Sequence, residues 1–174
     1  MLFSKLKFAA LACAACATIA SAEMKMGFIN SEEIFKSYQG TKEAQDKFNK
    51  EVAKWEQQAT DMQKEIKDLK EKLDKQGLLL SIERKKEIEE KLKTKLATYQ
   101  EFLQTKFGQQ GEAVSKNEEL TKPIIAKINK IINKIAKDEN YDFIFDQRGG
   151  ALVFAKDSYD LTTRVVTILN KEKD

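Results

Sequence analysis

The sequence has no histidine, and its two cysteines, Cys13 and Cys16, both lie in an apolar run near the N-terminus. The rest of the chain therefore has no Ser-His or Cys-His pair and lacks the usual zinc ligands. The seven glycines are scattered and form no phosphate-binding loop. Adjacent carboxylates such as Glu89 and Glu90 stand among lysines and are interpreted as solvated charge. The sequence predicts a protein that is not an enzyme and has no cofactor or metal site.

Long hydrophobic runs are also absent outside the N-terminus. The apolar run Phe8 to Ala20 follows Lys5 and Lys7 and is too short to span a bilayer. It ends in Ala-Ser-Ala at residues 20–22, a pattern typical of signal-peptide cleavage. Residues 1–22 are therefore predicted to be a cleaved signal peptide, which places the mature protein, starting at Glu23, in the periplasm.

The two cysteines leave a lipid anchor open as an alternative. Cys13 follows a short apolar run, and Cys16 lacks the usual leucine three residues before it. Their C-x-x-C spacing is interpreted as incidental, because both thiols would leave with the signal peptide. Loss of Lys5 and Lys7 lowers the net charge from +3 to about +1. Since lysine alternates with acidic residues and produces little net field, no nucleic-acid partner is expected.

A long helical pattern occupies the middle of the chain. Its apolar residues follow one another at steps of 4 and 3, the 3.5-residue average of a coiled-coil seam. The seam consists of Ala44, Phe48, Val52, Trp55, Ala59, Met62, Ile66, Leu69 and Leu73. Nearly everything between is charged or amide-bearing, which predicts a helix from a Thr41 cap to about Gln76. Such a helix needs a partner to cover its stripe.

A second helical stripe follows a turn at Gly77 and is predicted to begin at a Ser81 cap. It consists of Ile88, Leu92, Leu96, Tyr99, Leu103, Phe107 and Val114. Two stripes joined by a short turn predict an antiparallel helical hairpin. Gly108, Gly111 and Pro123 are candidate hinges, and Pro123 predicts either a kink or a new helix capped by Thr121. A further apolar face follows at Ile124, Ile128, Ile131 and Ile135.

The two ends of the chain show strand patterns. Met24 to Asn30 is predicted to be a strand, followed by a short helix that Ser31 caps and Gly40 ends. Tyr141 to Asp146 and Ala151 to Ala155 are predicted to form a β-hairpin around the turn at residues 147–150. A last helix is expected after a Ser158 cap, with an apolar face at Leu161, Val165, Ile168 and Leu169.

The predicted fold class is α+β and mostly α. A small β-containing body, residues 23–40 and 120–174, carries a protruding antiparallel coiled-coil arm, residues 41–119. Body core or an oligomer interface is expected at Phe28, Ile29, Phe143, Phe145, Leu152 and Phe154. The arm tip has an apolar triplet and then a basic one: Leu78, Leu79, Leu80, Arg84, Lys85 and Lys86.

The function of the tip has two interpretations. The leucines either close the end of the coiled coil or contact a binding partner, because exposed apolar clusters often mark interaction sites. The basic triplet is either a solvated face or a site that attracts acidic segments of a partner, lipopolysaccharide phosphates or a membrane surface.

Three segments resemble the Skp/OmpH family of periplasmic chaperones. They are MGFINSEEIF (Met26 to Phe35), YDFIFD (Tyr141 to Asp146) and ALVFAKDSYDLTTRVVTILN (Ala151 to Asn170), at the two ends of a charged helical hairpin. The resemblance implies a homotrimer whose arms enclose unfolded outer-membrane proteins without ATP. The alternative is a non-enzymatic coiled-coil scaffold of the cell envelope.

Overall fold

The computed structural model describes residues 24–172 of the chain. The signal peptide predicted for residues 1–22 lies outside this range. The elements are β1 (Met26–Ile29), α1 (Ser31–Ser37), α2 (Gln39–Gln76), α3 (Ile82–Phe107), α4 (Glu112–Asp138), β2 (Phe143–Asp146), the 3-10 turns η1 (Gln147–Gly149) and η2 (Asp157–Tyr159), and α5 (Thr162–Lys171).

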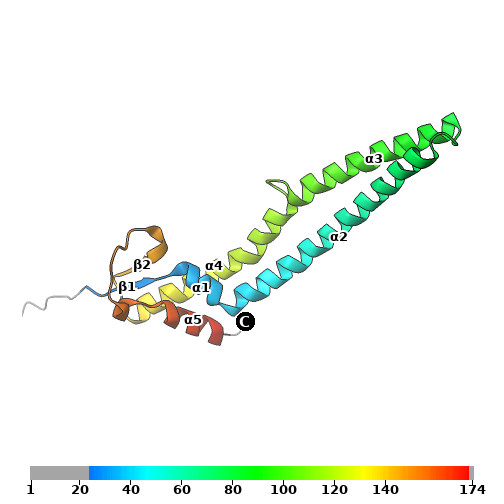
Figure 1. Ribbon diagram of the computed structural model, residues 1–174. Helices are drawn as coiled ribbons and strands as arrows, with labels where there is room; N and C mark the ends of the chain where they lie inside the picture. Colours follow the sequence, from blue (N-terminus) through cyan, green and yellow to red (C-terminus); the bar gives the residue numbers. More distant parts are fainter. Residues whose placement is uncertain (1–23, 173–174) are drawn as a thin grey trace, which may run out of the picture.

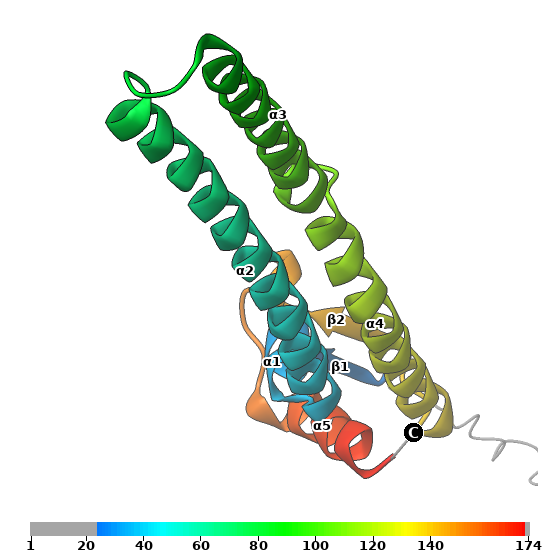
Figure 2. The same cartoon turned by 90° about the vertical axis from the view of Figure 1, so that its right-hand side faces the viewer.

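A long helical arm extends from a small body, as predicted (Figure 1). Helix α2 has 38 residues and is therefore about 57 Å long at 1.5 Å per residue. Helix α3 returns beside it (Figure 2). All nine residues of the predicted α2 seam are buried or half-buried, and Trp55 and Ile66 are the most deeply buried of them. The 3.5-residue pattern therefore identified the contact face of α2.

The returning half of the arm is made of two helices. Helix α3 ends at Gly108 and α4 begins after Gly111, which confirms that the glycines interrupt the helix. Pro123 lies inside α4, so the prediction of a new helix there is wrong. Thr121 donates its hydroxyl to the Asn117 carbonyl at 2.8 Å instead of capping a helix. Proline removes only one backbone donor, and the buried isoleucines on both sides of it hold α4 against the body. The expected boundary at residues 119 and 120 lies inside this continuous helix.

The starts of the first two helices differ from the predictions. Asn30, not Ser31, caps α1, since its side chain accepts a hydrogen bond from the Glu33 amide at 3.0 Å. Gly40 does not end a helix but lies in the first turn of α2, where a Cβ would stand 2.5 Å from the Tyr38 ring. Glycine is needed for this close approach, and α2 consequently begins before Thr41.

The last helix also starts later than predicted. Residues around Ser158 form the 3-10 turn η2, and α5 begins at Thr162. The Asp160 carboxylate accepts a hydrogen bond from the Thr162 amide at 2.8 Å. Asp160 therefore satisfies a free donor at the helix start, where its negative charge is favoured.

The predicted β-hairpin is wrong. Strand β2 pairs in parallel with β1, with Met26 opposite Phe143 and Ile29 opposite Asp146, and these strands make the two-stranded sheet of the described chain. After β2 the chain enters η1, and Gly150 adopts a positive φ of 69°. Residues 151–155 therefore do not run back along β2. The far edge of β1 is met by Leu161, whose amide donates to the Phe28 carbonyl at 2.8 Å.

One core holds the body together. Helices α1, α4 and α5 and the inner face of the sheet contribute its buried residues: Ile29, Ile34, Tyr38, Ile124, Ile128, Ile131, Ile135, Leu161, Val165 and Leu169. The predicted isoleucine face of α4 and the apolar face of α5 are thus confirmed, with Ile168 packed at the core's margin. Burial of a side chain of this size contributes roughly 1.5–3 kcal/mol.

Candidate functional site

The tip of the arm exposes its leucines. Leu78 and Leu79 are 102% and 87% exposed, and Leu80 is half-buried. Ile82, which the sequence reasoning missed, is 83% exposed in the first turn of α3. Ser81 caps this turn as predicted, accepting a hydrogen bond from the Arg84 amide at 3.2 Å. Leu78 and Leu79 therefore do not close the coiled coil within one chain, and an apolar cluster stands at the far end of the arm.

The charges near the tip are partly compensated. Glu87 pairs with Arg84 at 2.6 Å and with Lys91 at 2.7 Å. Hydrogen bonds from Lys91 and Arg84 hold the pKa of Glu87 below its usual value. Lys85 and Lys86 are exposed, and neither makes an ion pair in the part of the chain that the structure describes. The predicted basic triplet therefore leaves two uncompensated positive charges beside the apolar cluster.

The break between α3 and α4 lies over Trp55. The Trp55 ring on α2 meets the Phe107 ring edge-on, with centroids 6.1 Å apart. The Lys106 ammonium lies 5.3 Å from the centroid of the Trp55 ring and 2.5 Å from the Glu112 carboxylate across the break. Phe107, expected in the buried stripe, is 41% exposed although its ring meets Trp55, and Val114, which follows the break, is 42% exposed. The candidate hinge thus rests on one buried aromatic side chain.

The sheet has one covered face and one partly open face. Side chains alternate along a strand, so Met26, Phe28, Phe143 and Phe145 share the partly open face, on which Phe28 is buried and the other three are exposed. Phe143 and Phe145 are 52% and 40% exposed, with stacked rings 6.1 Å apart between centroids.

The six residues predicted for body core or an interface therefore separate. Phe28 and Ile29 are buried, Leu152 is half-buried, and Phe143, Phe145 and Phe154 are exposed. For these last three, the prediction of core is wrong within a single chain, and the prediction of an interface stays a prediction.

An ionic cluster joins the ends of the body. The Arg164 guanidinium on α5 donates to the Glu139 carboxylate at 2.7 Å. Lys25 donates to the Glu139 carbonyl at 2.8 Å, and its ammonium lies 4.1 Å from the centroid of the Tyr141 ring. The hydrogen bond from Arg164 is the main reason that the pKa of Glu139 is lowered. The cluster ties the start of β1 to the end of α4 and to α5.

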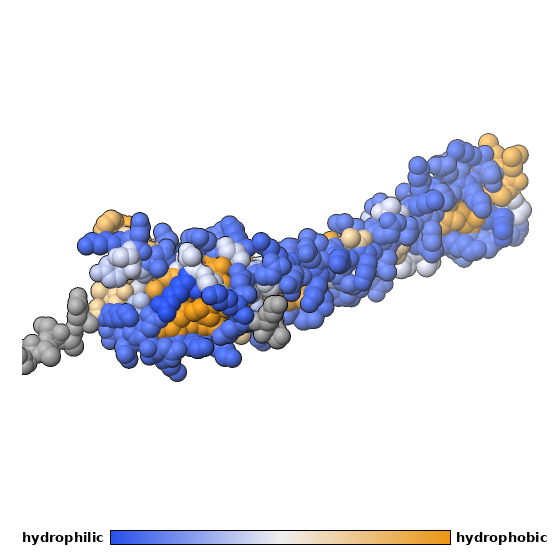
Figure 3. Space-filling view, turned by 90° about the horizontal axis from the view of Figure 1, so that it is seen from below, coloured by the Kyte–Doolittle hydropathy of each residue, from blue (hydrophilic) through white to orange (hydrophobic). Residues whose placement is uncertain are grey.

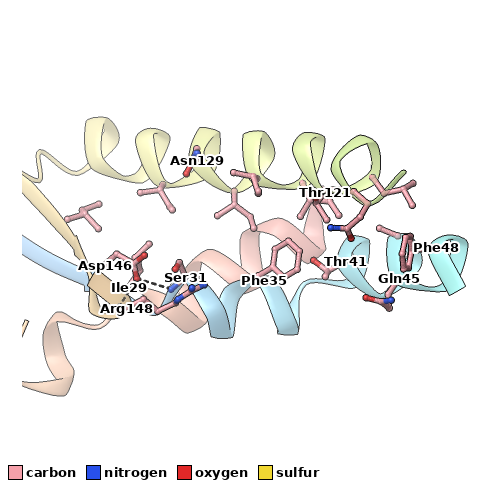
Figure 4. A pocket seen from close by; sticks show the side chains of 18 residues that line it. Ile29, Ser31, Phe35, Thr41, Gln45, Phe48, Thr121, Asn129, Asp146 and Arg148 are labelled. Atoms are coloured by element: carbon pink, nitrogen blue, oxygen red, sulfur yellow. Dashed lines mark hydrogen bonds between the residues drawn. The ribbon is translucent and has the colours of Figure 1, made fainter. Parts of the chain in front are cut away.

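A groove that the sequence reasoning missed lies at the base of the arm. It has a volume of about 690 Å³ and lies between α4 on one side and α1 and α2 on the other, with the sheet at one end (Figure 4). Ile125 could have indicated this groove in the sequence. It is apolar and adjacent to the buried isoleucine face of α4, but it does not follow the 3- and 4-residue spacing of that face. Ile125 lines the groove and is 50% exposed.

Within residues 24–172, no group of three or more acidic side chains is placed to hold a metal ion. Across the same range, no helix has both the length and the apolar character needed to cross a membrane.

The model of the family "Outer membrane protein (OmpH-like)" matches residues 25–169. The chain belongs to this family. No curated protein is significantly similar to it in sequence. Among solved structures it is similar to a "putative outer membrane chaperone (OmpH-like)" from Caulobacter crescentus CB15, with 15% identity over 87% of each chain and a TM-score of 0.77. At this identity the likeness shows a shared fold.

Family membership confirms the resemblance drawn from the two ends of the chain. The OmpH-like match begins one residue before β1 and ends in α5, so it includes the body and the entire arm. The fold shared with the Caulobacter protein likewise spans both parts. The body and arm are therefore one OmpH-like unit.

Proposed function

We propose that this chain is an ATP-independent chaperone that holds unfolded outer-membrane proteins in the periplasm and prevents their aggregation. The observation that carries the proposal is the position of apolar surface on a long charged arm. Apolar side chains are exposed at the tip, around Leu78 and Leu79, and on the body, whereas the surface between is mostly hydrophilic (Figure 3). Separated weak contacts suit an unfolded client, because several together give a high overall affinity.

Membership of the OmpH-like family and the fold shared with a protein described as an outer membrane chaperone support this function. A holdase needs no nucleotide. It binds the unfolded form by mass action, and release follows when folding or another acceptor competes. The signal-like N-terminus supports a periplasmic location, where unfolded outer-membrane proteins pass.

The partly open face of the sheet supports self-association, which we propose to be a homotrimer. A two-stranded sheet is marginal by itself. Phe143 and Phe145 also leave aromatic surface in water that a second chain could cover. We further propose that Lys85 and Lys86 attract lipopolysaccharide or an anionic membrane surface to the tip.

A scaffold of the cell envelope is the second candidate. It would use the arm as a rod that zips against other coiled coils and would need a second exposed stripe along α2. The seam of α2 is covered by the chain's own return helices, and its other positions are mostly charged or amide-bearing. The covered seam therefore favours the chaperone.

The test is native mass spectrometry of the mature chain, alone and after dilution of an unfolded outer-membrane β-barrel protein into it without nucleotide. Light scattering of the client, with and without the chain, is followed in parallel. A trimer that takes up one client and suppresses scattering supports the proposal. A chain that leaves client scattering unchanged overturns it and favours the scaffold.

A further inference from the structure

The groove at the base of the arm has apolar walls that no part of the described chain fills. Ile124, Ile125, Ile128 and Ile132 of α4 form one wall, and α1 and α2 add Phe35 and Phe48 opposite (Figure 4). Its volume of about 690 Å³ is within the range of natural binding sites, roughly 300–1,000 Å³. Because Ile125 stays half-exposed inside a concave surface, an apolar occupant would remove it from water.

The polar groups of the groove are mostly neutral. The amides of Gln45, Asn117 and Asn129 and the hydroxyl of Thr121 line it. Thr41 lines it too, and its hydroxyl oxygen is buried with no hydrogen-bond partner in the described chain. A buried polar atom without a partner is costly, and this oxygen lies below the groove surface, out of reach of an occupant. Neutral amides and hydroxyls both donate and accept, as the backbone of a peptide requires.

Two charged residues line the groove, both at the sheet end, and each has a partner. The Asp146 carboxylate accepts hydrogen bonds from the amides of Ser31, at 3.2 Å, and Arg148, at 3.1 Å. The Arg148 guanidinium lies 3.9 Å from the Glu32 carboxylate. The lining of the groove therefore has no cation free to bind a phosphate or carboxylate head group, although 34% of the whole chain is charged. The charge pattern therefore favours an uncharged occupant.

The groove is also elongated. Its lining on α4 runs from Asn117 to Ile132, a rise of about 22 Å at 1.5 Å per residue. An extended segment of about seven residues has the same length at about 3.3 Å per residue. The strands of a membrane β-barrel alternate apolar and polar side chains over about ten residues. Such a segment can direct one set of side chains to the isoleucines and the other to solvent and the amides.

We propose that this groove binds one extended, uncharged segment of an unfolded client, in which apolar residues alternate with small neutral polar ones. The inference rests on the proposed holdase function and assigns a defined contact to it. The apolar side chains pack on the wall made by α4, and the backbone of the segment forms hydrogen bonds with the exposed amides of Gln45, Asn117 and Asn129. The remaining contacts of the client are left to the tip and the rest of the arm.

The test measures binding of a fluorescent ten-residue peptide that alternates valine or leucine with serine or threonine. A second peptide has the same composition with its apolar residues grouped together. Ile125→Lys places a charge in the groove, and Val114→Lys is the matched control, because Val114 is similarly exposed on the same helix outside the groove. We expect Ile125→Lys to weaken binding of the alternating peptide at least about tenfold, Val114→Lys to change it less than about twofold, and the grouped peptide to bind more weakly.

A photo-crosslinking residue at position 125, compared with position 114, identifies the occupant directly. Crosslinks from position 125 to the alternating peptide support the proposal. Crosslinks from position 125 to a second copy of the chain or to a co-purified acyl lipid overturn it. Equal yields of peptide crosslinks at positions 125 and 114 also overturn it. If the wild-type chain suppresses client aggregation but Ile125→Lys binds the peptide normally, the groove assignment fails and the holdase stands. If the wild-type chain suppresses no aggregation, the proposed function fails, whatever the peptide does.

Discussion

Lys106 at the end of α3 and Glu112 at the start of α4 form an ion pair of 2.5 Å across the break in the arm. The two residues belong to different helices, separated by Gly108 to Gly111, and the same ammonium lies over the Trp55 ring. The break is therefore held from two sides, by a charge pair spanning it and by the aromatic side chain beneath it. Their contributions differ in size, and this difference is measurable.

Trp55→Ala is expected to lower the free energy of unfolding by about 3 kcal/mol, because it leaves a cavity below the break and removes the contact with Phe107. Glu112→Gln is expected to cost less than about 1 kcal/mol, since the Glu112 side chain is half-exposed and the pair is screened by water. Urea unfolding followed by far-UV circular dichroism compares both variants with the wild type. Equal losses in the two variants would show that burial of Trp55 is not the main support.

Alanine at Gly108 and Gly111, two of the candidate hinges, is expected both to stiffen and to strain the break. A Cβ on Gly108 would lie 2.4 Å from the Gln104 carbonyl oxygen, and one on Gly111 would lie 2.8 Å from the Lys106 carbonyl oxygen. Backbone atoms cannot move aside as a side chain can, so the helix ends must shift. We expect the double variant to lose about 1–3 kcal/mol of stability and to change the angle of the arm.

The angle is checked by small-angle X-ray scattering and by spin-label distances between body and tip. Gly149→Ala is the matched control, because a Cβ there meets no atom within 4 Å. If the double variant keeps the wild-type distances and client capacity for clients of all sizes, the break is not a functional hinge.

Leu78→Ser combined with Leu79→Ser tests the tip. Both side chains are almost fully exposed, so stability is expected to change by less than about 0.5 kcal/mol. If the tip contacts clients, suppression of client aggregation falls while the unfolding curve stays unchanged. Met24→Ser, at an exposed apolar residue of the body, is the control. Wild-type suppression by the double variant would remove the tip from the client-binding surface.

The sequence predicted the arm well because its order is local. Each residue of the seam, from Ala44 to Leu73, repeats at a spacing that a single helix defines, and burial follows that spacing. Helix α4 continues through Pro123 because a buried isoleucine face outweighs one lost hydrogen bond. The effect expected of Pro123 was judged from its immediate neighbours in the sequence. The packing of α4 against the body, which keeps the helix continuous, involves residues far away in the sequence.

The body was harder to predict because its pairing joins distant residues. A run such as Ala151 to Ala155 has the composition of a strand, but composition does not select a partner. Strand β2 finds β1, more than 110 residues earlier, and the left-handed Gly150 leads the next residues away. The groove depends on how α2 and α4 diverge above the sheet, and no spacing within one helix encodes that geometry.

Acid is expected to loosen the body through Glu139. The hydrogen bond from Arg164 lowers the pKa of Glu139 below its ordinary 4.5. A carboxylate with a lowered folded-state pKa stabilises the protein above its unfolded-state pKa and loses this effect as the pH falls through the folded-state value. Wild-type stability should therefore decline below pH 4.5 more steeply than that of Arg164→Gln. Urea midpoints between pH 3 and 7 measure this, with Lys54→Gln, in the ion pair with Glu51 on the arm, as the control.

Phe143→Ser combined with Phe145→Ser tests self-association. Both rings are exposed on one face of the sheet, so their loss should leave the fold of a single chain intact. It should remove the apolar surface through which chains would contact one another. We expect light scattering coupled to size-exclusion chromatography to show an oligomer for the wild type and a smaller species for the double variant. Ile82→Ser, at an exposed residue of the tip, should keep the wild-type mass.

Two results would contradict this use of the sheet. A wild-type chain that is monomeric at every concentration would leave the aromatic face without a second copy to cover it. A double variant with the wild-type mass would place the interface elsewhere, on α5 or the arm. A smaller double variant with an unchanged circular dichroism spectrum would show that these two rings join the chains. The sheet of one chain would then be one part of a contact shared among the chains of the oligomer, which explains why so small a sheet leaves its aromatic face in water.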